Sequence, residues 1–307
     1  MSWLSGKDDS LAGNTSTEML RVELPEQLDA VTRQWRRAGL EIALVPTMGN
    51  LHEGHLALVK AAQNEADRVV CSLYVNPAQF GEDEDFERYP RSLAADITLL
   101  QEAECDVLFA PDSRAVYPNG LDNAVHLVAS PDLAASLEGA TRPGHFDGVV
   151  SVVARLFNMV RPDIAVFGEK DYQQLLIIRR LVEDLCYRIR ILPVPTVREP
   201  SGLAMSSRNN YLEPPQREAA SRLHTVLQET ASRVRNEQTD LGKLESEAET
   251  RLEHHGFRVD YFAVRRSEDL AIPQKGDCHL RLLAAVWSRN TRLIDNVFVK
   301  RVGICKV

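Results

Sequence analysis

Residues 42–55 read IALVPTMGNLHEGH, and this stretch determines what kind of fold the chain can build. Ile42–Pro46 is a short apolar run that ends at a turn, which indicates a buried strand. After it, Leu56, Val59 and Ala62 recur at three-residue steps, which predicts one face of a helix from about 55 to 67. The sequence therefore predicts a strand, a polar loop and a helix in direct succession.

The same alternation continues as far as residue 192. Buried strands are predicted at Val69–Val75, Asp106–Ala110, Ile164–Phe167 and Arg188–Leu192, and helices near 93–100 and at Val149–Val160 and Tyr172–Asp184. Strands that alternate with helices and are apolar throughout favour a parallel sheet with helical crossovers. Ligands of such sheets bind beyond the carboxyl ends of the strands, so the polar clusters that follow each strand are the candidate binding residues.

The pattern changes between residues 193 and 213, where Pro193, Pro195 and Pro200 interrupt it. Helices are predicted beyond this point at 214–236 and Leu241–His255, followed by strands at Val259–Val264, Leu280–Trp287 and Arg292–Val299. We therefore predict an α/β fold with a smaller α+β C-terminal domain. The expected divisions are a disordered N-terminal extension at 1–18, a larger domain at 19–196 and a smaller domain at 197–307.

Composition excludes several classes of protein. The 307 residues are 44% hydrophobic and 26% charged, which is typical of a globular chain and rules out disorder throughout. No segment approaches the roughly 18 apolar residues of a membrane span. The net charge of -8, without clustered basic residues, argues against a nucleic-acid partner. Five scattered cysteines and a start without signal or transit character predict a reducing, cytoplasmic location, without a disulfide framework or zinc ribbon.

The loop at 46–55 carries the most specific chemistry. Gly49 and Gly54 allow the backbone to approach a ligand closely, and the helix that follows offers free N–H groups to a phosphate. His52 and His55 add two imidazoles there, an arrangement that suggests nucleotidyl transfer with stabilisation of charge at an α-phosphate. The alternatives are an ordinary polar loop and a zinc site, although no cysteine or third histidine is nearby.

Further polar clusters follow other predicted strands. Gln79 offers an amide suited to a hydroxy acid, and Gln174 is a second candidate for substrate binding. Lys170 can bind phosphate, Asp171 can accept from ribose or adenine, and Gly168 permits close approach of a nucleotide. Read alone, Gln79 is better explained as a surface residue, and Lys170 and Asp171 are better explained as helix-capping and solvent-exposed residues.

Three remaining segments are less specific. The loop at 197–209 contains two serines and Arg208, which suit a triphosphate clamp that can close over a ligand. Arg142 and His145 either face the site or belong to a loop that only connects elements. The acidic run at 82–87 is better explained as a solvated loop than as a magnesium site.

Together these segments resemble one family. VPTMGNLHEGH, YVNPAQF, YPR, RPGHFDGV, FGEKDYQQ and GLAMSSRN occur in the order found in the pantoate–β-alanine ligases, and the likeness runs from about residue 20 to 300. The resemblance implies a Rossmann-like, nucleotidyltransferase-type domain, a smaller lid domain and a homodimer. It also implies a reaction in which ATP and pantoate form pantoyl adenylate, with Mg²⁺ present, and β-alanine then releases pantothenate and AMP.

The resemblance also implies roles for individual residues. His55 would be the catalytic proton donor, with His52 beside it on the phosphates and with Lys170 and Arg208 as further catalytic groups. Gln79 and Gln174 would hold pantoate, while the magnesium ligands stay unassigned. The implied ATP-binding residues are Met48, Gly49, Asn50, Leu51, His52, Glu53, Gly54, His55, Gly168, Glu169, Lys170, Asp171, Val197, Met205, Ser206, Ser207 and Arg208.

Two departures and two competing functions accompany this identification. Ala78 stands where many family members have Met, and the extension before residue 20 has no counterpart. One competing function is a different HxGH nucleotidyltransferase that acts on a phosphorylated acceptor, which would require more basic residues near Gln79 and Gln174. The other is a non-catalytic nucleotide-binding protein, which predicts damaged motifs, and the motifs are intact.

Overall fold

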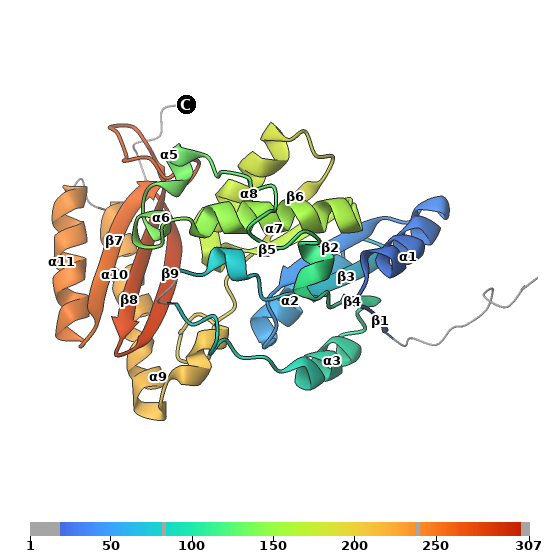
Figure 1. Cartoon of the computed structure of the whole chain (residues 1–307). Helices are drawn as coiled ribbons and strands as arrows, with labels where there is room; N and C mark the ends of the chain where they lie inside the picture. Colours follow the sequence, from blue (N-terminus) through green and yellow to red (C-terminus); the bar gives the residue numbers. More distant parts are fainter. Residues whose placement is uncertain (1–18, 82–83, 237–239, 302–307) are drawn as a thin grey trace, which may run out of the picture.

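A computed structural model describes residues 19–81, 84–236 and 240–301. Within these residues, a six-stranded parallel sheet and a three-stranded antiparallel sheet lie side by side, each with its own helices (Figure 1). The prediction of an α/β fold with a parallel sheet and a smaller α+β part is confirmed. The extension predicted at 1–18 lies outside the described residues.

The strands of the larger sheet are arranged in the order β1-β4-β3-β2-β5-β6, and every neighbouring pair is parallel. β2 lies beside β5 through the pairs Ala43↔Ile164 and Leu44↔Ala165. The bounds of the strands are β1 Leu20–Val22, β2 Ile42–Thr47, β3 Arg68–Leu73, β4 Val107–Phe109, β5 Ile164–Gly168 and β6 Arg190–Val194.

The order of the strands reverses between β2 and β5. Helix α2 (Glu53–Gln63) leads from β2 to β3 in one direction, and α8 (Tyr172–Asp184) leads from β5 to β6 in the other. The loops after β2 and β5 consequently leave adjacent strand ends in opposite directions, which is the position where ligands of open parallel sheets bind. The two most informative polar clusters of the sequence are therefore placed at the same edge of the sheet.

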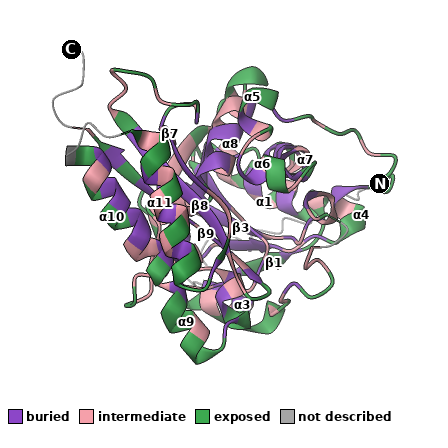
Figure 2. Ribbon diagram, turned by 90° about the vertical axis from the view of Figure 1, so that its left-hand side faces the viewer, coloured by how far each residue is buried: buried purple, intermediate pink, exposed green. Residues whose placement is uncertain are grey.

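Alternate residues of the strands pack on opposite faces of the sheet. Ile42 and Leu44 belong to the core beneath α1 (Pro25–Arg37), α7 (His145–Val160) and α8. Ala43 and Val45 belong to the core beneath α2 and α3 (Leu93–Glu102). Much of the strand ribbon is accordingly buried (Figure 2). Helices on both faces explain why these strands read as continuous apolar runs.

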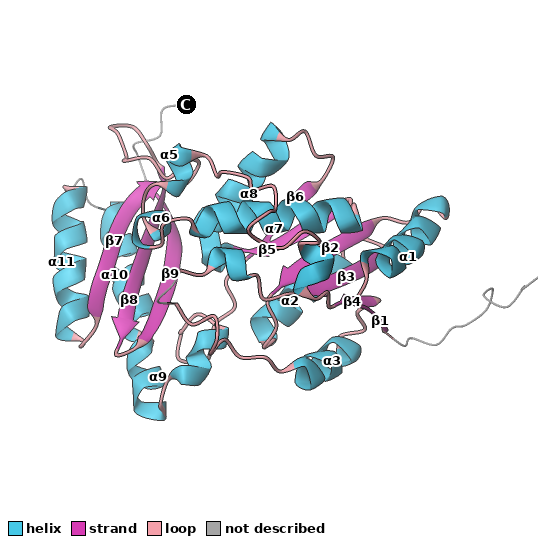
Figure 3. Cartoon of the chain, viewed as in Figure 1, coloured by secondary structure: helices cyan, strands magenta, loops and turns pink. Residues whose placement is uncertain are grey.

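The smaller part of the chain is a β7-β8-β9 antiparallel sheet, with α10 and α11 packed on one of its faces (Figure 3). Its other face contributes Ala263 and Leu283 to the core beneath α7 and α8, so the two parts share an apolar contact. The elements are α9 Pro214–Ala220, α10 Arg222–Asn236, α11 Leu241–His254, β7 Arg258–Arg266, β8 His279–Ser288 and β9 Thr291–Lys300.

Several elements were not predicted from the sequence. β1 is too short to show alternation, and α7 begins at His145 rather than Val149 because Gly144, with a φ of 79°, lies at its N-cap and the polar first turn is helical. The domain boundary near residue 196 stays a prediction. The other unpredicted elements are α1, α4 Ser113–Val116, α5 Pro131–Ala134, α6 Glu138–Thr141, and the 3₁₀ turns η1 Pro77–Gln79, η2 Glu169–Asp171 and η3 Ser207–Tyr211.

Two expectations from composition can be compared with the structure. None of the helices in the described ranges is long and apolar enough to cross a membrane. Cys71, Cys105 and Cys186 are free thiols, whereas Cys278 is disulfide-bonded. The cysteine spacing did not predict this bond, because distance along the chain does not reveal which cysteines are neighbours in the fold.

We expect Phe109→Ala to destabilise the protein by roughly 3–5 kcal/mol, because this fully buried side chain of β4 would leave a cavity in the core that also contains Ile42 and Leu44. Urea unfolding followed by circular dichroism measures the change. Phe298→Ala is the matched control, since that ring is 48% exposed and its loss should cost less than about 0.5 kcal/mol. Equal effects of the two substitutions would contradict the assignment of the core.

Candidate active site

The loop after β2 is held by one buried carboxylate. Asp96 of α3 is 1% exposed and accepts the backbone N–H groups of Asn50 at 3.0 Å and Leu51 at 2.8 Å. Gly49 and Asn50 both have positive φ values, of 83° and 50°, and two hydrogen bonds to a buried acceptor offset the cost of the latter conformation. Asp96 therefore fixes the backbone from which the two histidines extend.

The imidazoles of His52 and His55 lie together at the N-terminus of α2, with 4.1 Å between the ring centroids. Nδ1 of His52 accepts the N–H of Gly54 at 3.1 Å, and Nδ1 of His55 accepts the N–H of His52 at 3.3 Å. A neutral imidazole whose Nδ1 is an acceptor carries its proton on Nε2. Both rings are thus arranged as Nε2–H donors.

The structure explains why the third position of the HxGH motif, Gly54, is a glycine. A Cβ atom at Gly54 would lie 2.8 Å from Cε1 and 2.9 Å from Nδ1 of His52, closer than real contacts allow. Any other residue would push away the His52 ring that accepts the Gly54 N–H. The nearest protein atoms belong to the neighbouring imidazole. The close approach of a ligand to Gly54 stays a prediction.

Both imidazoles are neutral at physiological pH. Burial, followed by the charge of Lys170, lowers the pKa of His52 to about 4. Burial, followed by the charges of His52 and Lys170, lowers the pKa of His55 to about 3. Because the Lys170 ammonium acts on both rings, it belongs to the same site. Two neutral N–H donors and one cation can stabilise negative charge that develops on a phosphoryl group.

The segment after β5 carries Lys170 and is held from the smaller sheet. Asn296 of β9 donates its amide N–H groups to the carbonyls of Glu169 and Lys170, at 2.9 Å each. The Glu169 carboxylate points toward Arg281 of β8, at 3.4 Å, rather than toward the histidines. Lys170 lies 3.8 Å from Asp171, so its ammonium is only loosely paired.

The loop at 197–209 packs against the loop at 46–55, which carries His52 and His55 and is named the histidine loop. The contact joins Asn50 and Ser207, which are 157 residues apart in the sequence. The Ser207 hydroxyl donates to the Asn50 carbonyl at 3.0 Å, and the Asn50 amide donates to the Ser207 carbonyl at 3.4 Å. The Met205 N–H donates to the Val197 carbonyl at 3.0 Å and closes the loop on itself. The polar loops at 46–55 and 197–209 are therefore in contact.

Gln79 is buried at the end of η1 and lies beside Met48 of the histidine loop. Its side chain donates to Sδ of Met48 at 3.1 Å and accepts from Asn76 at 3.3 Å. A Cβ at Gly148 would lie 2.1 Å from the Ala78 carbonyl oxygen, so α7 can approach this turn only with glycine there. The close packing of backbone on backbone fixes the position of Gln79.

The two adjacent glutamines of α8 have different surroundings. Gln173 is buried, accepts the Glu138 N–H at 3.0 Å and donates to the carbonyls of Leu133 and Ser136, so its role is structural. Gln174 instead lines a small cavity of about 40 Å³ together with Lys170. The sequence identified Gln174, and the structure places it beside Lys170.

A cavity of about 860 Å³ lies between the two parts of the chain. Lys170, Asp171, Ser206 and Arg208 are in its wall, whereas neither imidazole is. Glu53 is exposed on the first turn of α2 and faces away from the core. The cavity is large enough for a nucleotide-sized ligand.

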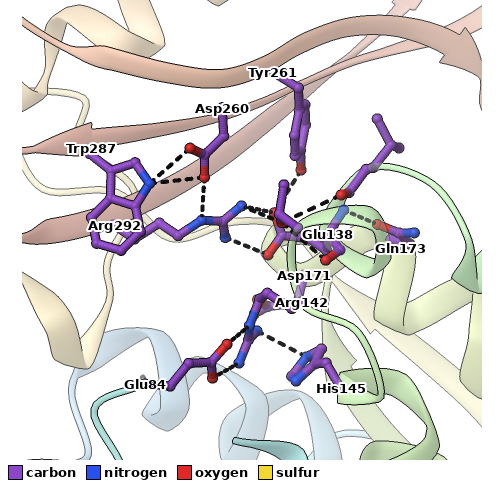
Figure 4. Close-up of polar contacts among 12 residues, drawn as sticks. Glu84, Glu138, Arg142, His145, Asp171, Gln173, Asp260, Tyr261, Trp287 and Arg292 are labelled. Atoms are coloured by element: carbon purple, nitrogen blue, oxygen red, sulfur yellow. Dashed lines mark hydrogen bonds and ion pairs between the residues drawn. The ribbon is translucent and has the colours of Figure 1, made fainter. Parts of the chain in front are cut away.

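Part of the wall of this cavity is a cluster of ion-paired side chains, which come from both parts of the chain. Arg292 of β9 donates to Glu138 at 2.6 and 2.9 Å and to Asp260 at 2.8 Å, and the Tyr261 hydroxyl donates to Glu138 at 2.8 Å (Figure 4). Burial alone would raise the pKa of Glu138, but Arg292 holds it below its usual value. The cluster joins the small sheet to α6, and no local pattern in the sequence predicts it.

The acidic run is not the solvated loop that we expected. Glu84 and Asp85 are partly buried and form two-pronged ion pairs with Arg142 and Arg208, while Glu87 is exposed. Glu82 and Asp83 lie outside the described residues. The prediction failed because the partners are 58 and 123 residues away along the chain.

The described residues do not build a metal site. No group of three or more His, Cys, Asp or Glu side chains among them is arranged to hold a metal ion. Glu84 and Asp85 are engaged by arginines, and Asp96 is engaged by backbone N–H groups. The zinc alternative for the histidine loop therefore has no support in this part of the chain.

A family model described as Pantoate-beta-alanine ligase matches residues 21–298. The chain belongs to this family. A pantothenate synthetase from Thioalkalivibrio sulfidiphilus is 52% identical over 279 residues, which are 91% of this chain and 97% of the relative. The family resemblance identified from the motifs is confirmed.

Solved structures of the family superpose on the chain. Pantothenate synthetase from Thermus thermophilus has a TM-score of 0.83 at 44% identity, covering 91% of this chain and 99% of that one. A pantoate-beta-alanine ligase from Francisella tularensis, complexed with beta-gamma ATP and beta-alanine, has a TM-score of 0.77 at 33% identity, covering 91% and 97%. The fold of the ligase family is therefore shared over nearly the whole chain.

We expect neither His52 nor His55 to titrate between pH 5 and pH 8 in the ligand-free protein, because burial and Lys170 lower both pKa values to about 4 and 3. Ring ¹⁵N NMR of the folded protein measures this, with His55→Gln used for assignment. The unfolded chain binds these protons near pH 6.5, so both rings also make stability fall as the pH decreases from about 6.5 toward 4. A ring that titrates near 6.5 would contradict the described environment.

Proposed function

We propose that this chain uses ATP to activate pantoate as pantoyl adenylate and then joins the pantoyl group to β-alanine, forming pantothenate. In the first step a pantoate carboxylate oxygen attacks the α-phosphorus, and pyrophosphate leaves. In the second step the β-alanine amine attacks the acyl carbon, loses a proton and releases AMP. Membership of the ligase family supports this reaction, and the paired Nε2–H donors beside Lys170 are the structural observation that carries it.

The proposed role of the two imidazoles is to stabilise charge at the α-phosphoryl group. With low pKa values, His52 and His55 act as neutral hydrogen-bond donors rather than as imidazolium acids. His55 can share its Nε2 proton with a phosphoryl oxygen, which refines the role of proton donor that the resemblance implies. Attack by a carboxylate requires no protein nucleophile, so charge stabilisation and positioning are sufficient.

The remaining polar groups divide between the two substrates in this proposal. Lys170 and Arg208 bind the triphosphate, and Asp171 and Ser206 complete the nucleotide side of the cavity. Gln79, which contacts Met48, and Gln174, which lines the small cavity with Lys170, hold pantoate. The loop at 197–209 closes the site and excludes water, which would otherwise hydrolyse the acyl adenylate.

Magnesium enters the proposal only as the ion that accompanies ATP. Mg²⁺ keeps several waters and binds mainly to substrate phosphates with one or two carboxylates, so the lack of a protein-built site in the described residues is compatible with this. We assign no ligand and no step to the metal. A homodimer and a cytoplasmic location, which the resemblance implies, are likewise part of the proposal, and sedimentation analysis of the purified chain tests the former.

A transfer to a phosphorylated acceptor is the less favoured function. Such an enzyme needs basic side chains free to bind the acceptor phosphate near Gln79. Arg142 is the arginine beside Gln79, and it donates to Glu84, to His145 and to the Gln79 carbonyl. Four of its five N–H groups are therefore already used by the protein.

An assay with ATP, pantoate, β-alanine and Mg²⁺ tests the proposal, by following AMP and pantothenate. We expect AMP to form only when both organic substrates are present. AMP formation that ignores pantoate, or no AMP formation at all, would overturn the proposed function.

In the same assay we expect His55→Ala to slow adenylate formation by about 10²–10³-fold, the usual cost of losing one donor to a developing oxyanion. Loss of its contact with the His52 N–H should cost only about 1 kcal/mol of stability. His254→Ala, at an exposed histidine of α11, is the control. Normal adenylate formation by a folded His55→Ala protein would remove this residue from the mechanism.

The two neighbouring glutamines allow a second comparison. Gln174→Ala should raise the KM for pantoate about 10-fold with little change in Tm, because it removes a substrate contact. Gln173→Ala should lower the Tm instead, because it leaves buried backbone groups of Leu133, Ser136 and Glu138 without partners. Thermal unfolding and initial rates separate the two outcomes, and the reverse pattern would contradict both assignments.

A further inference from the structure

The adjacent carboxylates of Glu84 and Asp85 each accept two hydrogen bonds from one arginine, in both cases from its Nε and Nη2 groups. Glu84 accepts from Nε and Nη2 of Arg142, at 2.6 Å each. Asp85 accepts from Nε of Arg208 at 3.0 Å and from Nη2 at 2.8 Å. A two-pronged pair of this kind fixes the plane of a guanidinium as well as its position. Each arginine is left with its Nη1 side to use elsewhere.

Arg142 uses its remaining donors inside the protein. Nη1 lies 3.0 Å from Nε2 of His145, and Nη2 donates to the Gln79 carbonyl at 3.4 Å. Because a guanidinium only donates, Nε2 of His145 accepts, and its Nδ1–H donates to the same Gln79 carbonyl at 2.8 Å. Figure 4 shows Arg142 between Glu84 and His145. Glu84 is thus connected, through Arg142 and His145, to the backbone of Gln79.

Arg208 uses its remaining donors differently. It lines the large cavity with Lys170 and Ser206, and none of the described residues accepts a hydrogen bond from its Nη1. Its guanidinium lies 5.8 Å from the centre of the Tyr89 ring, which restricts it on one side. Burial alone would lower the pKa of Arg208, but Asp85 raises it, so the arginine stays charged. Its open edge suits phosphate oxygens.

We propose that Glu84 and Asp85 are positioning residues with separate tasks: Asp85 aims the free edge of Arg208 at the triphosphate, and Glu84 fixes the turn that presents Gln79 to the hydroxy acid. This inference rests on the proposed function and extends it. It explains why two neighbouring acidic residues are partly buried in ion pairs, when a solvated loop would leave them in water.

The sign of one effect separates this proposal from its main rival. If Asp85 instead occupied the phosphate site and had to be displaced by ATP, removing its charge would strengthen ATP binding. If Asp85 orients Arg208, removing its charge weakens ATP binding, because the freed guanidinium samples other rotamers.

The test compares Asp85→Asn with Glu84→Gln in steady-state assays in which ATP or pantoate is varied. We expect Asp85→Asn to raise the KM for ATP about 10-fold and to change the KM for pantoate less than about twofold. Glu84→Gln should show the opposite pattern. Binding of ATP alone, measured by calorimetry, should weaken about 10-fold in Asp85→Asn and stay within about twofold in Glu84→Gln.

Asp269→Asn is the matched control, because Asp269 makes a two-pronged pair with Arg266 away from both cavities. If Glu84→Gln does not fold, Glu84→Asp keeps the charge with a shorter reach and is judged by the same criterion. Tighter ATP binding in Asp85→Asn, unchanged KM values, or equal changes in both KM values for both variants would overturn the inference. Absence of activity in the unmodified protein would instead overturn the proposed function.

Discussion

The parallel pairing of β2 with β5 is the constraint on which the site depends. Only two residue pairs join these strands, yet they place the carboxyl ends of β2 and β5, and the loops that follow them, side by side. The chain leaves β2 toward β3 and leaves β5 toward β6, so the loops that follow separate at the position where ligands of open parallel sheets bind. The histidine loop follows β2, and Lys170 follows β5.

At this edge of the sheet, the backbone determines the tautomer of the two histidines. Each Nδ1 accepts a main-chain N–H, so each Nε2 keeps its proton, and burial beside Lys170 prevents further protonation. These three effects favour the same result, which is a pair of fixed, neutral donors. Fixed donors need no rearrangement when charge develops, and this is how electrostatic stabilisation contributes most to catalysis. Asp96 supports this arrangement because it accepts hydrogen bonds from the backbone N–H groups of Asn50 and Leu51, which directly precede the histidines.

The sequence predicted what depends on local patterns. The strands β2 to β6 and the helix Tyr172–Asp184 follow from apolar runs and helical spacing, and the histidine loop follows from its position after a strand. Contacts between distant segments were not predictable in this way. Asp96 looks like an ordinary polar residue of a helix, and Glu84 and Asp85 look like part of a solvated run. Only the fold brings them to Leu51, Arg142 and Arg208.

In the proposed reaction, the paired imidazoles and Lys170 promote attack of the pantoate carboxylate on ATP before β-alanine takes part. Exchange of labelled pyrophosphate into ATP, measured with pantoate but without β-alanine, tests this most directly. We expect exchange to require pantoate and to proceed without the amine. Exchange that occurs only when β-alanine is present, or that proceeds without pantoate, would contradict it.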